Sequence, residues 1–169
     1  LLAALAAGDP YRVSRSLSFE AGFVATVGPS AHDRAEELLR AAQTAVDKSR
    51  HPHALLARAF LLAQLGRFGE AWTVAQEQTE RLREARGTGH EAWLGWIARL
   101  EGDEERAAEH FRSFCESLET LGQSAALSTF LPELARSLSA IVRHAEAEPL
   151  AERGRELGCR EGWVGTGSG

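Results

Sequence analysis

Histidine, cysteine and carboxylate residues occur in this sequence, but their spacing favours no metal site. His51 and His53 flank a proline and come closest to a pair of metal ligands. Residues two apart on a helix point to different sides, and no cysteine or acid stands at ligand spacing, so we interpret both as surface histidines. His110 and Cys115 are five residues apart and lie on different helix faces. We therefore predict that the protein binds no metal.

Other catalytic signatures are also missing. The only lysine, Lys48, does not belong to a phosphate-binding loop, and the sequence has no GxSxG motif. Acidic pairs such as Glu104 and Glu105 stand where helices are expected to begin, which suits the positive end of the helix dipole. Cys115 is interpreted as a buried thiol, and Cys159 as a thiol in a loose tail with no neighbour that would lower its pKa. We predict a protein that is not an enzyme and uses no cofactor.

The composition excludes several classes of partner. The 169 residues carry a net charge of −5, with arginines and glutamates interspersed, so no nucleic-acid partner is expected. No apolar run approaches the roughly 20 residues of a membrane span, and two cysteines give no disulfide framework. The simplest setting is the reducing cytoplasm. Arginine used almost to the exclusion of lysine suggests a bacterial source, and a start at Leu1 without any methionine suggests an internal piece of a longer protein.

A short phrase recurs along the chain. It reads LAQLGRFGEA at 62–71 and ARLEGDEERA at 98–107, with weaker copies at 25–35 and 139–147. The alanines that close the four copies follow one another at intervals of 36, 36 and 40 residues; they are Ala35, Ala71, Ala107 and Ala147. A period in this range is typical of stacked supersecondary units.

Apolar residues at steps of three and four predict helices between these phrases. We expect four helical hairpins, at about 10–48, 52–84, 89–121 and 124–157. Residues 1–7 are interpreted as the end of a truncated preceding helix and residues 158–169 as a flexible tail. Pro132 predicts a helix that starts at about Phe130 or kinks there, and Pro149 is expected only in the first turn of the last helix.

These hairpins resemble the tetratricopeptide repeat. In that motif small residues lie where two helices cross, and glycine permits the tight turn between paired helices. In the second hairpin the resemblance rests on Leu55, Ala59, Leu62, Gly66, Phe68, Ala71 and Ala75; in the third it rests on Leu94, Gly95, Ala98, Gly102, Ala107 and Phe111. The fourth departs from the pattern, with Val142 in the place of glycine. The resemblance implies an all-α protein, a right-handed α-solenoid of about four hairpins. The residues taken to define the repeats are Ala35, Ala59, Gly66, Ala71, Gly95, Gly102, Ala107 and Ala147.

The stretches GDPYRVSRSLSFEAGF and LGQSAALSTFLPELARSL also resemble the C-terminal helical repeats of large bacterial signalling proteins. In these a STAND-type ATPase is joined to a kinase, a nucleotide cyclase or a transcription regulator. The resemblance implies a regulatory scaffold that binds a protein, a peptide or another domain of its own parent chain. The alternative is a purely structural spacer, which stacks on neighbouring repeats and positions an attached domain.

The motif's groove positions imply a candidate partner-binding surface. Transferred to this chain, they are Arg15, Ser18, His53, Gln64, Trp96, Arg99, Arg136 and Ser139. Trp96 is the candidate apolar anchor, and Arg99 and Arg136 are candidate partners for acidic groups. Alternatively, Trp96 packs between repeats. Leu56 and Phe60 replace the residues that clamp a peptide carboxyl terminus in chaperone-binding repeats, which argues against that mode of binding.

Overall fold

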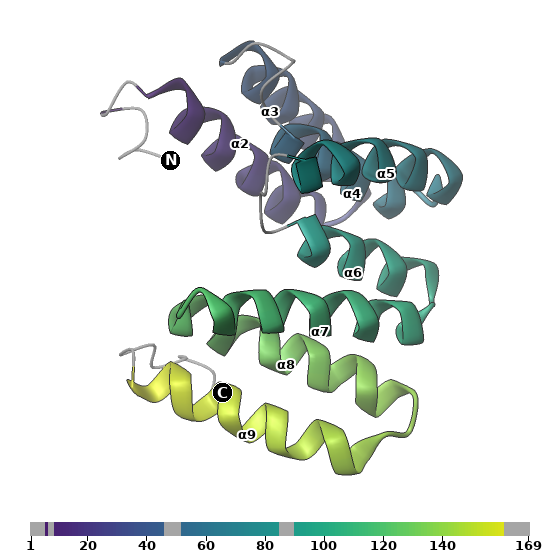
Figure 1. Ribbon diagram of the computed structural model, residues 1–169. Coiled ribbons are helices and arrows are strands. Elements are labelled where there is room, and N and C mark those ends of the chain that lie inside the picture. The colour runs from purple at the N-terminus through teal and green to yellow at the C-terminus, as the bar shows by residue number, and fades with distance from the viewer. Residues whose placement is uncertain (1–5, 7–8, 46–51, 85–89, 161–169) are drawn as a thin grey trace. The chain divides into compact units, whose positions relative to one another are not determined.

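The computed structural model describes residues 6, 9–45, 52–84 and 90–160, and every regular element in these ranges is helical (Figure 1). The prediction of an all-α protein is therefore confirmed. Most of the predicted end of a preceding helix, at 1–7, lies outside the described residues, as does the predicted tail from residue 161 onward. The chain forms two compact units, residues 1–93 and 94–169, and their boundary falls within helix α6, His90–Glu101.

The first unit has a core built largely from alanine. Helix α2 packs on α3 and on α4, and α4 packs on α5. The side chains at these contacts are small enough for the helices to approach closely, and Ala35, Ala59 and Ala71 have no exposed surface. The elements are α2 (Pro10–Ala25), the short 3₁₀-helix η1 (Pro29–Ala31), α3 (His32–Ala45), α4 (Pro52–Gln64) and α5 (Phe68–Glu84).

Trp93, near the start of α6, is only 3% exposed and packs into this core. Its ring centroid lies 5.7 Å from those of Phe19 on α2 and Phe60 on α4. Gly22 makes room for it, because a Cβ atom at residue 22 would lie 3.2 Å from the indole.

The second unit has larger core side chains. Helix α7 (Glu104–Thr120) packs on α8 (Ser124–Ala140), which packs on α9 (His144–Arg160). The core between these helices is made of aromatic and branched residues that are almost completely buried; they include Phe111, Leu118, Leu131 and Leu138. Gly154 lets α9 approach α8, because a Cβ atom there would lie 2.8 Å from the Cδ atom of Pro132.

Four helix ends share one hydrogen-bonded turn. The residue after each helix's C-cap has positive φ, the left-handed conformation that glycine adopts at least cost. Its N–H bonds to the carbonyl three residues back, and the next N–H bonds to the carbonyl five residues back, which is the Schellman arrangement. The left-handed residues are Gly66, Gly102, Gly122 and Val142. Glycine turns at 66 and 102 are thus confirmed, and Val142 takes the same conformation at φ 63°.

The expected start of α8 at about Phe130 and the expected place of Pro149 in a first turn are both wrong. Helix α8 starts at Ser124 and continues through Pro132, and α9 carries Pro149 beyond its first turn. A proline inside a helix costs one backbone hydrogen bond, and for Pro132 the contact of its ring with Gly154 offsets part of that loss. Helix α9 also extends to Arg160, so Cys159 lies on a helix and not in a loose tail.

Candidate functional site

The residues predicted to line a groove are divided between the two units. In the first unit Arg15 is exposed and its guanidinium lies 5.7 Å from the centre of the Phe19 ring. Gln64 is half-buried at the end of α4, and the side chain of His53 lies outside the described residues. Ser18 has no exposed surface and donates a 2.8 Å hydrogen bond to the Ser14 carbonyl. Its assignment to a binding surface is wrong, because it faces the core.

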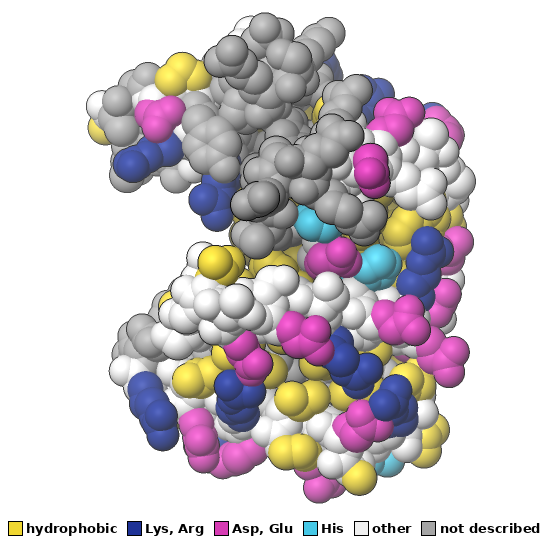
Figure 2. Space-filling view, viewed as in Figure 1, with side chains coloured by type: hydrophobic (Ala, Val, Ile, Leu, Met, Phe, Trp, Pro, Cys, Tyr) yellow, Lys and Arg dark blue, Asp and Glu magenta, His cyan; other side chains and the backbone are white. Residues whose placement is uncertain are grey.

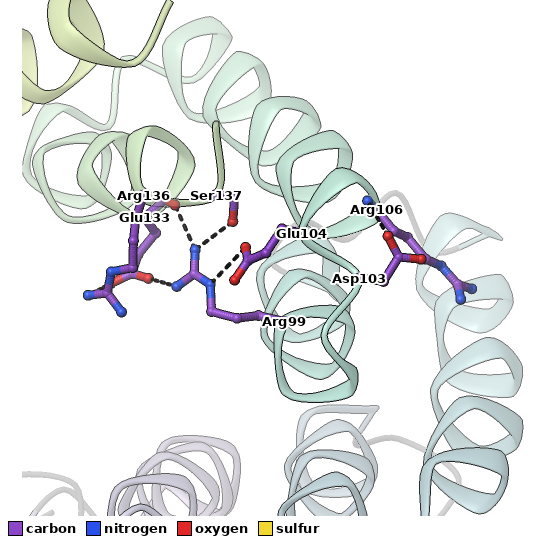
Figure 3. A network of polar contacts seen from close by, with 7 residues as sticks. All are labelled: Arg99, Asp103, Glu104, Arg106, Glu133, Arg136 and Ser137. Carbon is purple, nitrogen blue, oxygen red and sulfur yellow. Dashed lines mark hydrogen bonds and ion pairs between the residues drawn. The ribbon is translucent and has the colours of Figure 1, made fainter. Parts of the chain in front are cut away.

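The second unit brings Arg99 into a polar network that joins three helices (Figure 3). Arg99 Nη1 donates to a carboxylate oxygen of Glu133 on α8, and Nη2 donates to the Glu133 carbonyl and the Ser137 hydroxyl, each at 2.7 Å. Arg99 Nε lies 3.5 Å from a carboxylate oxygen of Glu104 on α7. The guanidinium of Arg99 on α6 therefore interacts with residues of both following helices, α7 and α8.

Partial burial strengthens these contacts. The side chain of Arg99 is 16% exposed and that of Glu133 is 21% exposed. The Arg99 guanidinium also lies over the face of Phe111, 4.9 Å from the ring centre, an arrangement that favours a cation. The predicted role of Arg99 as a partner for an external acid is untested, but its donors already serve groups of its own chain.

Arg136 and Ser139 lie on the outer side of α8. The Arg136 side chain is 67% exposed, and its Nη2 atom lies 3.4 Å from the second carboxylate oxygen of Glu133. Ser139, one turn further along α8, is exposed. Glu133 therefore accepts hydrogen bonds from Arg99 through its carboxylate and its carbonyl, but makes only one longer contact with Arg136. Most of the Arg136 guanidinium stays open to solvent.

Trp96 is half-buried in an aromatic cluster beside this network. Its ring centroid lies 6.4 Å from that of Phe111 on α7 and 5.6 Å from that of Phe130 on α8. Phe130 in turn meets Phe114 edge to face at 4.7 Å. Trp96 therefore packs against α7 and α8 and keeps part of its surface accessible.

Sequence reasoning missed the acidic partners in this unit. Three ion pairs between helices each join residues 34 positions apart; they are Arg99–Glu133, Arg112–Glu146 and Glu119–Arg153. They link α6 to α8 and α7 to α9. The repeat phrase did not point to these pairs, because its closing alanines recur at 36, 36 and 40 residues and the ion pairs at 34.

Arginine also forms short-range pairs at helix starts. Arg67 and Arg143, which follow the left-handed residues of two turns, each grip both carboxylate oxygens of the glutamate three residues later. These bonds hold the pKa of Glu70 and of Glu146 below its usual range. Figure 2 shows the wider pattern, with basic and acidic side chains interleaved over the helices of the second unit.

The remaining chemical candidates stay apart. Within the described ranges, no three His, Cys, Asp or Glu residues are grouped so that they could hold a metal ion. Cys115 is buried, as predicted, and burial raises the pKa of its thiol to about 12. Among the same residues, no helix has both the length and the apolar character needed to cross a membrane.

Comparison of the chain with protein-family models, with curated proteins and with solved structures finds no match.

Proposed function

We propose that this chain is a tetratricopeptide-like repeat segment, a right-handed α-solenoid of about four hairpins, that binds a protein or peptide partner. In this proposal it is a non-catalytic regulatory scaffold of a larger bacterial, cytoplasmic signalling protein. The observation that supports it is the recurrence of one turn at four helix ends, together with ion pairs at a constant interval of 34 residues. Stacked hairpins of this kind contact only their neighbours and leave an extended surface for partners.

The proposed contact surface in the second unit consists of Arg136, Ser139 and the accessible part of Trp96. Arg136 shares Glu133 with Arg99, and the Phe111 ring contacts both Arg99 and Trp96. In this proposal an exposed cation, a hydroxyl and an aromatic surface act together on one partner. The partner best suited to them carries a carboxylate next to an apolar side chain.

An array of synthetic peptides that vary in acidic and aromatic content tests this proposal. Peptides captured by the wild-type chain should bind the Arg136→Glu variant at least about tenfold more weakly, since the charge is reversed at the contact. Arg155→Glu is the matched control, because Arg155 is similarly exposed and lies on α9. Equal loss of binding in both variants, or in neither, would count against this surface.

A structural spacer is the second candidate, and the contacts of Arg99 and Trp96 favour it. Both side chains are engaged within the unit, as expected of residues whose task is to hold hairpins together. Trp96→Ala separates the two functions when binding is compared at equal fraction folded. If the chain is a spacer, the Trp96→Ala variant is less stable but binds the captured peptides as the wild type does. If Trp96 belongs to a binding surface, the variant also has a lower affinity for these peptides.

A further inference from the structure

Glu133 shares its carboxylate between two arginines of very different exposure (Figure 3). One oxygen accepts a hydrogen bond from Arg99 Nη1, and the other lies 3.4 Å from Arg136 Nη2. The side chain of Arg99 is 16% exposed, whereas that of Arg136 is 67% exposed. The Glu133 side chain itself is 21% exposed, so one largely buried acid faces both a largely buried cation and a solvent-exposed one.

Arg99 keeps the Glu133 carboxylate in this position. Its Nη2 atom also donates to the Glu133 carbonyl, at 2.7 Å, so the same guanidinium binds the side chain and the backbone of one residue. If the Glu133 carboxylate turned away, Arg99 would keep only Glu104 as an acidic partner among the described residues, at 3.5 Å from Nε. Leaving a largely buried charge without its partner is costly. The Glu133 carboxylate therefore stays beside Arg136 without depending on Arg136.

This fixed negative charge opposes any acid that binds Arg136. The carboxylate of a partner must either take the Arg136 Nη2 donor from Glu133 or bind another edge of the guanidinium with a like charge close by. Both arrangements lower the affinity, the first through a lost contact and the second through repulsion. The effect is modest, since an exposed ion pair changes an equilibrium by about fivefold at most.

We propose that Glu133 is the specificity-determining residue of the contact surface formed by Arg136, Ser139 and Trp96, because it competes with the partner's carboxylate for Arg136. This inference rests on the proposed function, since it concerns the same surface. A single carboxylate gains little from Arg136, because Glu133 already compensates part of its charge. A partner binds well only if an apolar side chain adds a contact with Trp96, so Glu133 makes the surface discriminate against acids that lack such a neighbour.

The test follows a labelled peptide with a glutamate next to a phenylalanine by fluorescence anisotropy. Glu133→Gln should bind this peptide about two- to fivefold more tightly than the wild type does, because the competing charge is removed. The gain should vanish with a second peptide that carries glutamine in place of its glutamate. It should also vanish when Glu133→Gln is introduced into the Arg136→Gln variant, because there is then no cation to compete for.

The matched control is Glu152→Gln. It removes an exposed carboxylate that pairs with Arg155 within α9, and it should bind the peptide as the wild type does. Affinities are compared at equal fraction folded, measured by circular dichroism, because Glu133→Gln also weakens the attachment of α6 to α8. If that variant is unfolded, the double variant Arg99→Met/Glu133→Leu takes its place, since it removes the competing acid without leaving a buried charge unpaired.

Three results would overturn the inference. The first is an affinity of the folded Glu133 variant equal to or below that of the wild type, which is what a role in stability alone predicts. The second is an equal gain for the peptide without glutamate, and the third is a gain that persists in the Arg136→Gln variant.

Failure of this inference can be distinguished from failure of the proposed function. If Arg136→Glu weakens binding but Glu133→Gln does not strengthen it, the competition is rejected and the proposed function stands. If Arg136→Glu and Arg155→Glu weaken binding equally, or not at all, the proposed function is rejected and the competition with it.

Discussion

The Arg99 guanidinium binds both the carboxylate and the backbone carbonyl of Glu133, 34 residues further along the chain. Bonding to the carbonyl fixes the position of α8 itself and not only of a flexible side chain. Since both side chains are largely removed from water, each charge depends on the other for compensation.

Glu133→Gln should destabilise the protein by about 1–3 kcal/mol, because it leaves Arg99 with only the more distant Glu104 carboxylate. Urea unfolding followed by circular dichroism measures the change. Glu152→Gln removes an exposed carboxylate that pairs within α9 and should change stability little. Equal effects of the two substitutions would show that the Arg99 network contributes no more than a surface pair.

Gly154→Ala should also destabilise the protein, by about 1–3 kcal/mol, because the new methyl group would press on the Pro132 ring at 2.8 Å. Gly95→Ala meets the Phe111 ring at the same distance and should behave alike. Thermal unfolding is a suitable measurement.

The control for both glycines is Gly69→Ala in α5, where a Cβ atom meets nothing within 4 Å. There the substitution restricts the unfolded chain without a clash and should raise stability by roughly 0.5–1 kcal/mol. Stabilisation by Gly154→Ala as well would mean that α8 and α9 do not approach as closely as described.

Val142→Gly should stabilise the protein by roughly 1 kcal/mol. A β-branched residue at φ 63° is strained, and glycine adopts this conformation without a side-chain clash. The reciprocal change, Gly102→Val, places the same strain at φ 91° and should destabilise. Urea midpoints that move in the same direction for both variants would contradict a shared turn.

Cys159 should react with a thiol reagent at pH 8 while Cys115 does not. Cys159 is exposed, whereas Cys115 is buried with a thiol pKa of about 12. At pH 8 the thiolate fraction of Cys115 is then on the order of 10⁻⁴. Mass spectrometry after brief labelling identifies the modified residue, and modification of Cys115 at the rate of Cys159 would refute its burial.

The same raised pKa predicts a loss of stability in alkali. The folded state keeps the Cys115 proton up to about pH 12, whereas the unfolded thiol releases it near its usual pKa. The unfolded state therefore binds fewer protons above that usual value, and the free energy of unfolding falls as the pH rises towards 12. This part of the decline should be absent in Cys115→Ala.

The helices and two of the turns could be predicted because their signals are local. Apolar spacing marks the stripe of α7, and Gly66 and Gly102 mark the ends of α4 and α6. Pro132 and Pro149 misled the prediction because local propensity disfavours proline inside a helix. For Pro132 the compensating contact, Gly154, is distant in sequence and invisible to a local reading.

The candidate site was less predictable because its contacts join separate helices. Motif offsets placed Arg99 on a groove, but the structure directs its guanidinium to Glu133 and Ser137. The same offsets placed Ser18 on a surface, although its side chain faces the core.

Helix α6 has 12 residues and α8 has 17, yet both end in the same bonded joint. A helix of this chain can therefore be a turn longer than another without any change to the bonds that end it, and the longer α8 lies within the longest interval between closing alanines, from Ala107 to Ala147.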